Sequence, residues 1–174
     1  MTTLQQPSLA TSMNTCRFLC DEMLERLGRW LRAAGYDTAI AVSGSDDRTL
    51  VEQARDEGRW LITRDRHLAR FRNGDGRVVL LEANDTPSLA AELSERFHID
   101  WLYRPFSRCL DCNTPLQPAT PAQAERLPPG KKVFAGDACY CPNCDKVLWR
   151  GSHVRRMRHT LENFAHRRWV VARD

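Results

Sequence analysis

The sequence has few lysines and no long apolar run, and both absences limit what the protein can be. Only three of its 26 basic residues are lysine, and the others are arginine. No apolar stretch approaches the roughly 20 residues of a membrane-spanning helix, so we expect no membrane association. Residues 1–15 also lack a basic region followed by an apolar core, the pattern of a secretory signal. We expect a disordered leader there.

The marks of a disulfide-rich secreted domain are missing as well. The chain has 174 residues and seven cysteines, an odd number, with no signal sequence before them. This combination favours a reducing compartment, and we predict the cytoplasm. Five of the seven cysteines fall within residues 109–144, which indicates metal binding rather than disulfide pairing.

Acidic residues are scarce in the second half of the chain. Residues 1–100 carry 13 basic and 16 acidic side chains, whereas residues 101–174 carry 13 basic and only 6 acidic ones. The second half is therefore the part expected to meet a polyanion. Arginine suits bidentate phosphate contact, although codon bias in a genome is an alternative explanation for its abundance.

Short apolar runs alternate with helical periodicity over residues 16–104. The predicted strands are residues 17–20, 38–42, 59–63 and 77–82, and the predicted helices are residues 23–34, 46–57, 64–71 and 86–97. Strands and helices that alternate with short connections predict an α/β domain with a parallel sheet flanked by helices. Such sheets place their functional sites beyond the carboxyl ends of the strands.

The pattern changes after residue 104. Prolines and paired cysteines replace the regular periodicity, which predicts a small second module over residues 105–151. Residues 152–174 are predicted to form a basic helix. Its apolar residues lie on one side of that helix: Val154, Met157, Leu161 and Phe164.

Aspartates follow three of the predicted strands. Asp21 comes after the first, Asp46 and Asp47 after the second, and Asp65 after the third. Carboxylates gathered at one edge of a sheet repel one another unless cations compensate, so the set indicates bound Mg²⁺ or Mn²⁺. Two such ions are the usual catalysts of phosphodiester hydrolysis.

Each of these acids also has a purely structural explanation. Asp46 suits a helix cap, and Asp47 suits the first turn of a helix, where it complements the dipole. The residues alone leave both the structural and the catalytic interpretation of these acids open.

Arg64 and Arg66 flank Asp65, where they are candidates for holding a substrate phosphate.

Two CxxC pairs give the clearest signal in the chain. They are Cys109 with Cys112 and Cys141 with Cys144. Four thiolates at this spacing predict a tetrahedral, structural Zn²⁺ site in a zinc ribbon, since no ligand position stays open for water. Cys139 is an alternative ligand, while Cys16 and Cys20 are expected to be core thiols.

Taken in order, five motifs resemble the Mut-seven C-terminal RNase family. They are "DEMLERLGRWLRAAGYD", "DDRTL", "RWLITRDRHL", "PFSRCLDCNTPL" and "CPNCDKVLWRGSH". The resemblance covers roughly residues 17–158. That family joins a PIN-like nuclease domain to a zinc ribbon. The resemblance therefore implies a PIN-like fold for residues 16–104 and metal-dependent hydrolysis of RNA.

The resemblance also implies roles for individual residues. It assigns the PIN-type acids to Asp21, Asp47 and Asp65, and the zinc ligands to the four cysteines of the CxxC pairs. A fourth acid stays open among three candidates: Asp46, Glu82 and Asp85. The motif "WRGSH" either packs the ribbon or touches substrate, and we take Arg150, His153 and Arg155 as candidate substrate contacts.

These observations predict a divalent-metal-dependent ribonuclease that cleaves single-stranded RNA. One alternative is an RNA-binding adaptor whose PIN-like fold is degenerate, and another is a nuclease that uses the same site on DNA. The RNA target, the endo- or exonucleolytic mode, protein partners and the oligomeric state stay open.

Overall fold

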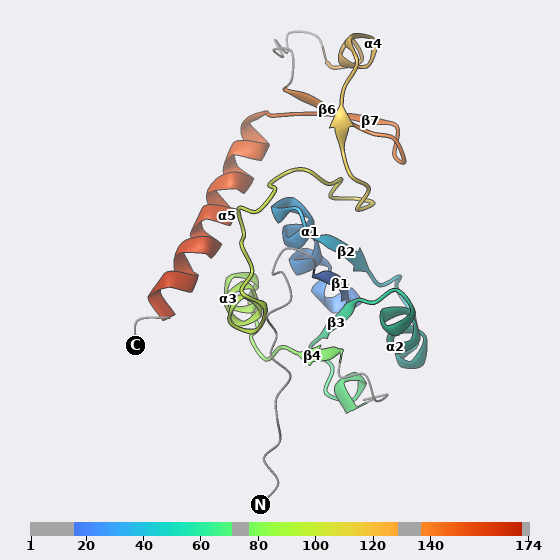
Figure 1. Ribbon diagram of the computed structural model, residues 1–174, viewed down its shortest axis with the longest axis vertical. Helices are drawn as coiled ribbons and strands as arrows, with labels where there is room; N and C mark the ends of the chain where they lie inside the picture. Colours follow the sequence, from blue (N-terminus) through green and yellow to red (C-terminus); the bar gives the residue numbers. More distant parts are fainter. Residues whose placement is uncertain (1–15, 71–76, 129–136, 172–174) are drawn as a thin grey trace, which may run out of the picture.

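The computed structural model describes residues 16–70, 77–128 and 137–171. The leader predicted for residues 1–15 lies outside these residues. The elements form an α/β domain, a small β module and a long C-terminal helix (Figure 1). An α/β fold followed by cysteine-containing strands and a helix is what the sequence predicts, and the predicted fold class is confirmed.

A four-stranded parallel sheet forms the centre of the first domain. Its strands stand in the order β2-β1-β3-β4. Their bounds are β1, Arg17–Cys20; β2, Asp37–Ile40; β3, Trp60–Thr63; and β4, Val78–Leu80. Because the chain runs from β1 to β2 in one direction and then crosses to β3 in the other, the order reverses between β1 and β3. Open parallel sheets bind their ligands at such a reversal, beyond the carboxyl ends of the strands.

Helices cover both faces of this sheet. They are α1, Glu25–Ala34; α2, Asp47–Asp56; and α3, Thr86–Phe97, with short 3₁₀ turns at Glu22–Leu24 and Leu68–Arg70. Helix α1 ends at Gly35, whose φ of 103° is a left-handed conformation. A Cβ atom at this position would approach the carbonyl oxygen of Arg104 to 2.6 Å, so glycine is required there.

Two elements differ from their predicted form. The second strand is shorter than predicted and ends at Ile40. The helix predicted for residues 64–71 is a single 3₁₀ turn at Leu68–Arg70. It starts after an Asp65 carboxylate that accepts the backbone N–H groups of His67 and Leu68, a local turn that replaces the first turn of a helix.

Alternate side chains of β1 pack into two separate cores. Phe18 and Cys20 face α1 and α3, whereas Leu19 faces α2. All three side chains are completely buried. Both faces of the strand are therefore apolar, as expected for a central parallel strand with helices on each side.

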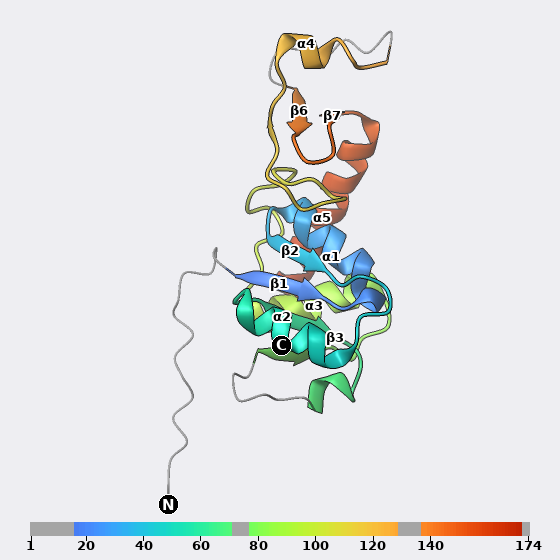
Figure 2. The same ribbon diagram turned by 90° about the vertical axis from the view of Figure 1, so that its right-hand side faces the viewer.

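The second module is a three-stranded antiparallel sheet. It contains β5, Gln117–Pro118; α4, Pro121–Ala124; β6, Ala138–Cys141; and β7, Lys146–Trp149, with β6 in the middle. Figure 2 shows this module above the parallel sheet, with β7 leading directly into the last helix.

That last helix, α5, covers Ser152–Val171 and confirms the predicted C-terminal helix. It packs against α1 and α3. Leu161 and Phe164 are buried there, and the Phe164 ring lies edge-on to Trp30 and Trp101, with centroids 5.5 and 5.1 Å apart. The inner side of α5 is thus part of the α/β core, while Arg155, Arg156 and Arg158 are exposed. Within the described part of the chain, no helix has the length and apolar character needed to cross a membrane.

A cluster of hydrogen-bonded charged and polar side chains lies at the amino end of the sheet. The buried guanidinium of Arg59 donates to Asp37 Oδ1 at 2.7 Å and to the carbonyl oxygen of Phe18 at 3.2 Å. Asn113 of the second module donates to the same Asp37 oxygen at 2.8 Å. Partial burial alone would raise the pKa of Asp37, but the hydrogen bonds from Arg59 and Asn113 outweigh it and lower the pKa to about 2.

We predict that Asp37→Asn lowers the free energy of unfolding by about 2 kcal/mol near pH 7. Because the folded-state pKa lies below the ordinary value, this contribution is present above about pH 4 and is lost as the pH falls toward 2. Urea unfolding of the zinc-loaded protein at several pH values measures it. The control is Asp56→Asn, which removes the carboxylate of an exposed surface ion pair with Arg55. A difference between wild type and Asp37→Asn that stays constant from pH 7 to pH 2.5 would contradict the assignment.

Candidate active site and metal centre

Asp21 and Asp65 are joined through one threonine at the carboxyl edge of the sheet. Thr63, fully buried at the end of β3, donates its hydroxyl to Asp21 Oδ2 at 2.7 Å. The same hydroxyl oxygen accepts the backbone N–H of Asp65 at 2.9 Å. Asp21 itself follows β1, and its backbone N–H donates to the carbonyl oxygen of Ile62 at 2.9 Å. Pairing of β1 with β3 therefore places the two acids next to the same hydroxyl group.

Asp47 joins this pair through a histidine. Asp65 Oδ1 accepts the backbone N–H of His67 at 2.6 Å, and the His67 Nδ1 atom lies 3.0 Å from Asp47 Oδ2. Asp47 is in the first turn of α2, the helix that follows β2. We call the residues Asp21, Thr63, Asp65, His67 and Asp47 the acid network. It contains the three aspartates to which the resemblance assigns catalysis, and it lies where the strand order reverses.

Thr63 and His67 are functional candidates that the sequence analysis did not identify. The signal that points to them is the spacing of Thr63, Asp65 and His67 directly after a buried strand, each two residues from the next. Side chains at this spacing after a strand end can turn to one edge. Without the position of β1, nothing in this spacing indicates that Thr63 contacts Asp21.

The structure supports the capping explanation for Asp46. Its two carboxylate oxygens accept the backbone N–H of Thr49 at 3.0 Å and the Thr49 hydroxyl at 2.6 Å. These bonds also lower the pKa of Asp46. Asp85 caps α3 in the same way through Ser88. Two of the three candidates for a fourth acid are therefore helix caps, and the third, Glu82, is exposed beyond β4.

The arginines around Asp65 differ in their surroundings. Arg64 donates to the Asn84 side chain, and its Nε atom is buried without a hydrogen-bond partner among the described residues. This N–H group is therefore a buried donor without an acceptor among the described residues. Arg66 is exposed. The other candidate substrate contacts are exposed where β7 meets α5: Arg150, His153 and Arg155.

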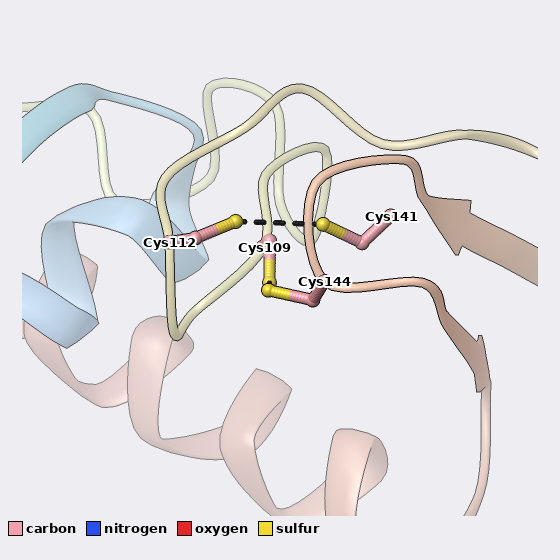
Figure 3. A group of neighbouring side chains, drawn as sticks. All are labelled: Cys109, Cys112, Cys141 and Cys144. Atoms are coloured by element: carbon pink, nitrogen blue, oxygen red, sulfur yellow. Dashed lines mark hydrogen bonds between the residues drawn. The ribbon is translucent and has the colours of Figure 1, made fainter.

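Four cysteines form the one metal-ligand cluster of the described residues. The four sulfur atoms of Cys109, Cys112, Cys141 and Cys144 all lie within 4.8 Å of one another (Figure 3). No other group of three or more cysteine, histidine or acidic side chains in that part of the chain reaches this proximity, so the acid network is more open than the cysteine cluster.

The geometry of the cysteines fits a tetrahedral ion. Cys112 Sγ lies 3.4 Å from Cys141 Sγ, and Cys109 Sγ lies 3.9 Å from Cys144 Sγ. A tetrahedron with zinc–sulfur bonds of about 2.3 Å has edges of about 3.8 Å. The sulfurs are therefore spaced for a shared zinc ion, and the cluster can bind zinc.

Both cysteine pairs sit in turns of the same kind. The residue after each second cysteine has a positive φ, 69° at Asn113 and 50° at Asp145. Cys112 Sγ also lies 3.3 Å from Thr114 Oγ1. Burial would raise the pKa of Cys112, but hydrogen bonds from Thr114 and from neighbouring cysteines lower it to about 6. A low pKa favours the thiolate, which is the form that binds metal.

The remaining cysteines lie outside this cluster. Cys139 is on β6 and is not among the four. Cys20 is completely buried in the core, where burial raises its pKa to about 12, and Cys16 packs against the same core. The prediction that Cys16 and Cys20 are core thiols is confirmed.

The first cysteine turn is tied directly to the parallel sheet. The buried Arg32 of α1 donates to the carbonyl oxygens of Leu110 and Asp111 at 2.8 and 2.9 Å. Its Nε atom donates to the carbonyl oxygen of Thr38 on β2 at 2.8 Å. The side chain of Asn113 accepts the backbone N–H of Thr38 at 3.1 Å. Order in the cysteine turn and order along β2 are therefore coupled.

We predict about one zinc ion per chain, and a lower melting temperature for the whole protein when zinc is removed. Zinc fixes the turn whose carbonyls Arg32 holds, so its loss also weakens the packing of β2 and α1. Elemental analysis and thermal unfolding followed by near-ultraviolet circular dichroism measure both effects. Cys141→Ser should lose the zinc and Cys139→Ser should keep it. Equal zinc contents in these two variants would contradict the assignment.

Comparison with known proteins agrees with this arrangement. The chain is 34% identical over 101 residues to a human protein, the exonuclease mut-7 homolog. The alignment covers 56% of this chain but only 12% of the human protein. A family model, the Mut7-C RNAse domain, matches residues 16–161, which include the acid network and all four clustered cysteines. The match extends over most of the sequence, and the chain therefore belongs to the Mut7-C RNAse domain family.

Proposed function

We propose that the protein is a divalent-metal-dependent ribonuclease that hydrolyses phosphodiester bonds of single-stranded RNA. The observation that carries this proposal is the acid network, in which hydrogen bonds through Thr63 and His67 link three aspartates where the strand order reverses. Membership of an RNase-domain family supports the same chemistry. None of the seven cysteines is paired in a disulfide, which supports the reducing cytoplasm as the place of action.

The donor atoms of the network suit Mg²⁺ or Mn²⁺. Carboxylate oxygens are the ligands that these hard ions prefer, and Mg²⁺ usually keeps several of its waters. Asp21, Asp47 and Asp65 can therefore hold an ion partly through water, without the close convergence seen for the four cysteines. A bound ion would supply Lewis-acid activation of the phosphodiester and of an attacking water.

The residues of the chain have distinct tasks in this proposal. Thr63 fixes Asp21 and Asp65 relative to each other, so that these carboxylates can orient a water molecule. His67 positions Asp47 from the other side of the edge. The partly exposed guanidinium of Arg64 is the candidate for holding a substrate phosphate next to Asp65. Arg66 is a second, exposed cation next to Asp65.

The basic surface near the cysteine module supplies contacts to the RNA backbone. Arg150, His153 and Arg155 are exposed at the junction of β7 and α5. Phosphate contacts of this kind give affinity that falls steeply with salt but carries little sequence information. Binding that persists when the acids are removed, with no cleavage by the wild-type protein, would instead indicate an RNA-binding adaptor.

We predict that Asp21→Asn and Asp65→Asn each reduce cleavage of an end-labelled single-stranded RNA by at least about 100-fold in Mg²⁺ or Mn²⁺. A substrate of the same sequence in DNA shows whether the sugar matters. Glu95→Gln, an exposed acid on α3, is the control and should cleave like wild type. If both aspartate variants cleave as fast as wild type, the assignment of these acids is wrong.

Thr63 gives a separate test of positioning. We predict that Thr63→Val, which keeps the shape but removes the hydroxyl, lowers kcat about tenfold or more because Asp21 and Asp65 lose their shared partner. Thr63→Ser should restore most of the rate, since it returns the hydroxyl. Steady-state kinetics and thermal unfolding of all three proteins measure this. An equal loss of activity in the serine and valine variants would indicate a packing role only.

A further inference from the structure

A cavity of about 290 Å³ lies between α1, the end of β2 and the first cysteine turn. Glu22, which directly follows Asp21 in the chain, lines it. Ile40, Ala41 and Ser43 also line it, and the backbone N–H of Ala41 donates to the carbonyl oxygen of Cys20, the residue before Asp21. The cavity is close to the lower size limit of small-ligand pockets, which begins at about 300 Å³.

The charges of this cavity disfavour a phosphate group. Three carboxylates and two guanidinium groups line it, which gives a net charge of −1: Glu22, Glu25, Asp111, Arg29 and Arg32. An anion placed there would meet more hydrogen-bond acceptors than free donors, which is unfavourable. A neutral group with N–H donors could donate to those same acceptors, which is favourable.

Most of these charged groups are already engaged with each other. Arg29 Nε lies 3.1 Å from Glu25 Oε1, and Arg29 also lies 3.8 Å from Asp111. Arg32 donates to backbone carbonyls. The carboxylate of Glu22 has no hydrogen-bond or ion-pair partner among the described residues, so it is the acceptor that remains available.

Apolar groups are available in and near this cavity. Ile40 and Ala41 contribute to its lining. Among the described residues, three large hydrophobic side chains are exposed, and two of them are sequence neighbours of lining residues: Met23, 57% exposed, follows Glu22, and Val42, 77% exposed, stands between Ala41 and Ser43. Apolar lining beside polar groups suits a planar ring whose edge makes hydrogen bonds.

We propose that this cavity binds one nucleobase of the RNA and prefers guanine. This inference rests on the proposed RNA substrate. Guanine is the base whose Watson–Crick edge presents two adjacent N–H donors, N1–H and N2–H, and a carboxylate accepts such a pair with both oxygens. Glu22 is that carboxylate. Glu22 directly follows Asp21 in the chain, so a base held by Glu22 would be bound next to the residue that begins the acid network.

Direct binding tests this proposal independently of cleavage. The probes are fluorescein-labelled 12-residue oligouridines that carry guanosine, adenosine or cytidine at every fourth position, with the all-uridine strand as reference. Fluorescence anisotropy is measured on the zinc-loaded, full-length Asp65→Asn protein, which keeps the RNA intact. We expect the guanosine strand to bind at least about fivefold more tightly than the other three, within the roughly 5- to 150-fold range of a bidentate base contact.

Variants then assign the preference to the cavity. In the same background, Glu22→Gln replaces one acceptor by a donor, and Ser43→Trp fills the exposed entrance. Both should reduce the ratio of all-uridine Kd to guanosine Kd to between about 1 and 2. Glu95→Gln removes an acid of the same type on α3 and should leave the ratio unchanged. The ratio is the readout because a general change in charge alters both affinities together.

Three results would overturn the proposal. One is an equal affinity for all four strands, and another is a guanosine preference that survives both Glu22→Gln and Ser43→Trp. The third is Glu22-dependent binding of a tri-arginine peptide without any guanosine preference, which would assign the cavity to a cationic side chain of a protein partner. A guanosine preference without metal-dependent cleavage would support the cavity assignment and contradict the proposed function. Metal-dependent cleavage without a guanosine preference would support the proposed function and contradict the cavity assignment.

Discussion

The hydroxyl of Thr63 lies between Asp21 and Asp65, donating to the first at 2.7 Å and accepting the backbone N–H of the second at 2.9 Å. This contact exists because β1 and β3 are parallel neighbours whose registers match Cys20 with Ile62, so that Thr63 stands level with Asp21. The strand order of the sheet also reverses between these two strands. One hydrogen-bonded group therefore connects the topology of the sheet with the arrangement of its acids.

The cysteine module is attached to the other end of the same sheet. Arg32 holds the carbonyls of the first cysteine turn, and Asn113 bridges Asp37 and Thr38 on β2. Helix α5 then returns from β7 and buries Leu161 and Phe164 in the α/β core. The metal cluster thus contributes to one continuous structure, and it carries the basic junction of β7 and α5 beside the nuclease-like domain.

Local patterns in the sequence predict much of this fold. The three- and four-residue spacing before Gly35 predicts α1, because residues close in sequence determine a helix. The two CxxC pairs predict the cysteine cluster although Cys112 and Cys141 are 29 residues apart, because each pair is a recognisable metal-binding turn and four thiolates complete one tetrahedral site. Thr63 and His67 are different. Their contacts with Asp21 and Asp47 span 42 and 20 residues, and only the pairing of distant elements brings them together. The cavity beside Glu22 likewise needs α1, β2 and the first cysteine turn at once, so no single motif indicates it.

The central claim is that the acid network holds a divalent ion at the carboxyl edge of the sheet. A crystal of the zinc-loaded protein soaked in Mn²⁺, with anomalous data collected above and below the manganese edge, tests it most directly. We expect manganese density among Asp21, Asp47 and Asp65, separate from the zinc at the four cysteines. Crystals that bind manganese elsewhere on the protein, with none at these three aspartates, would contradict it.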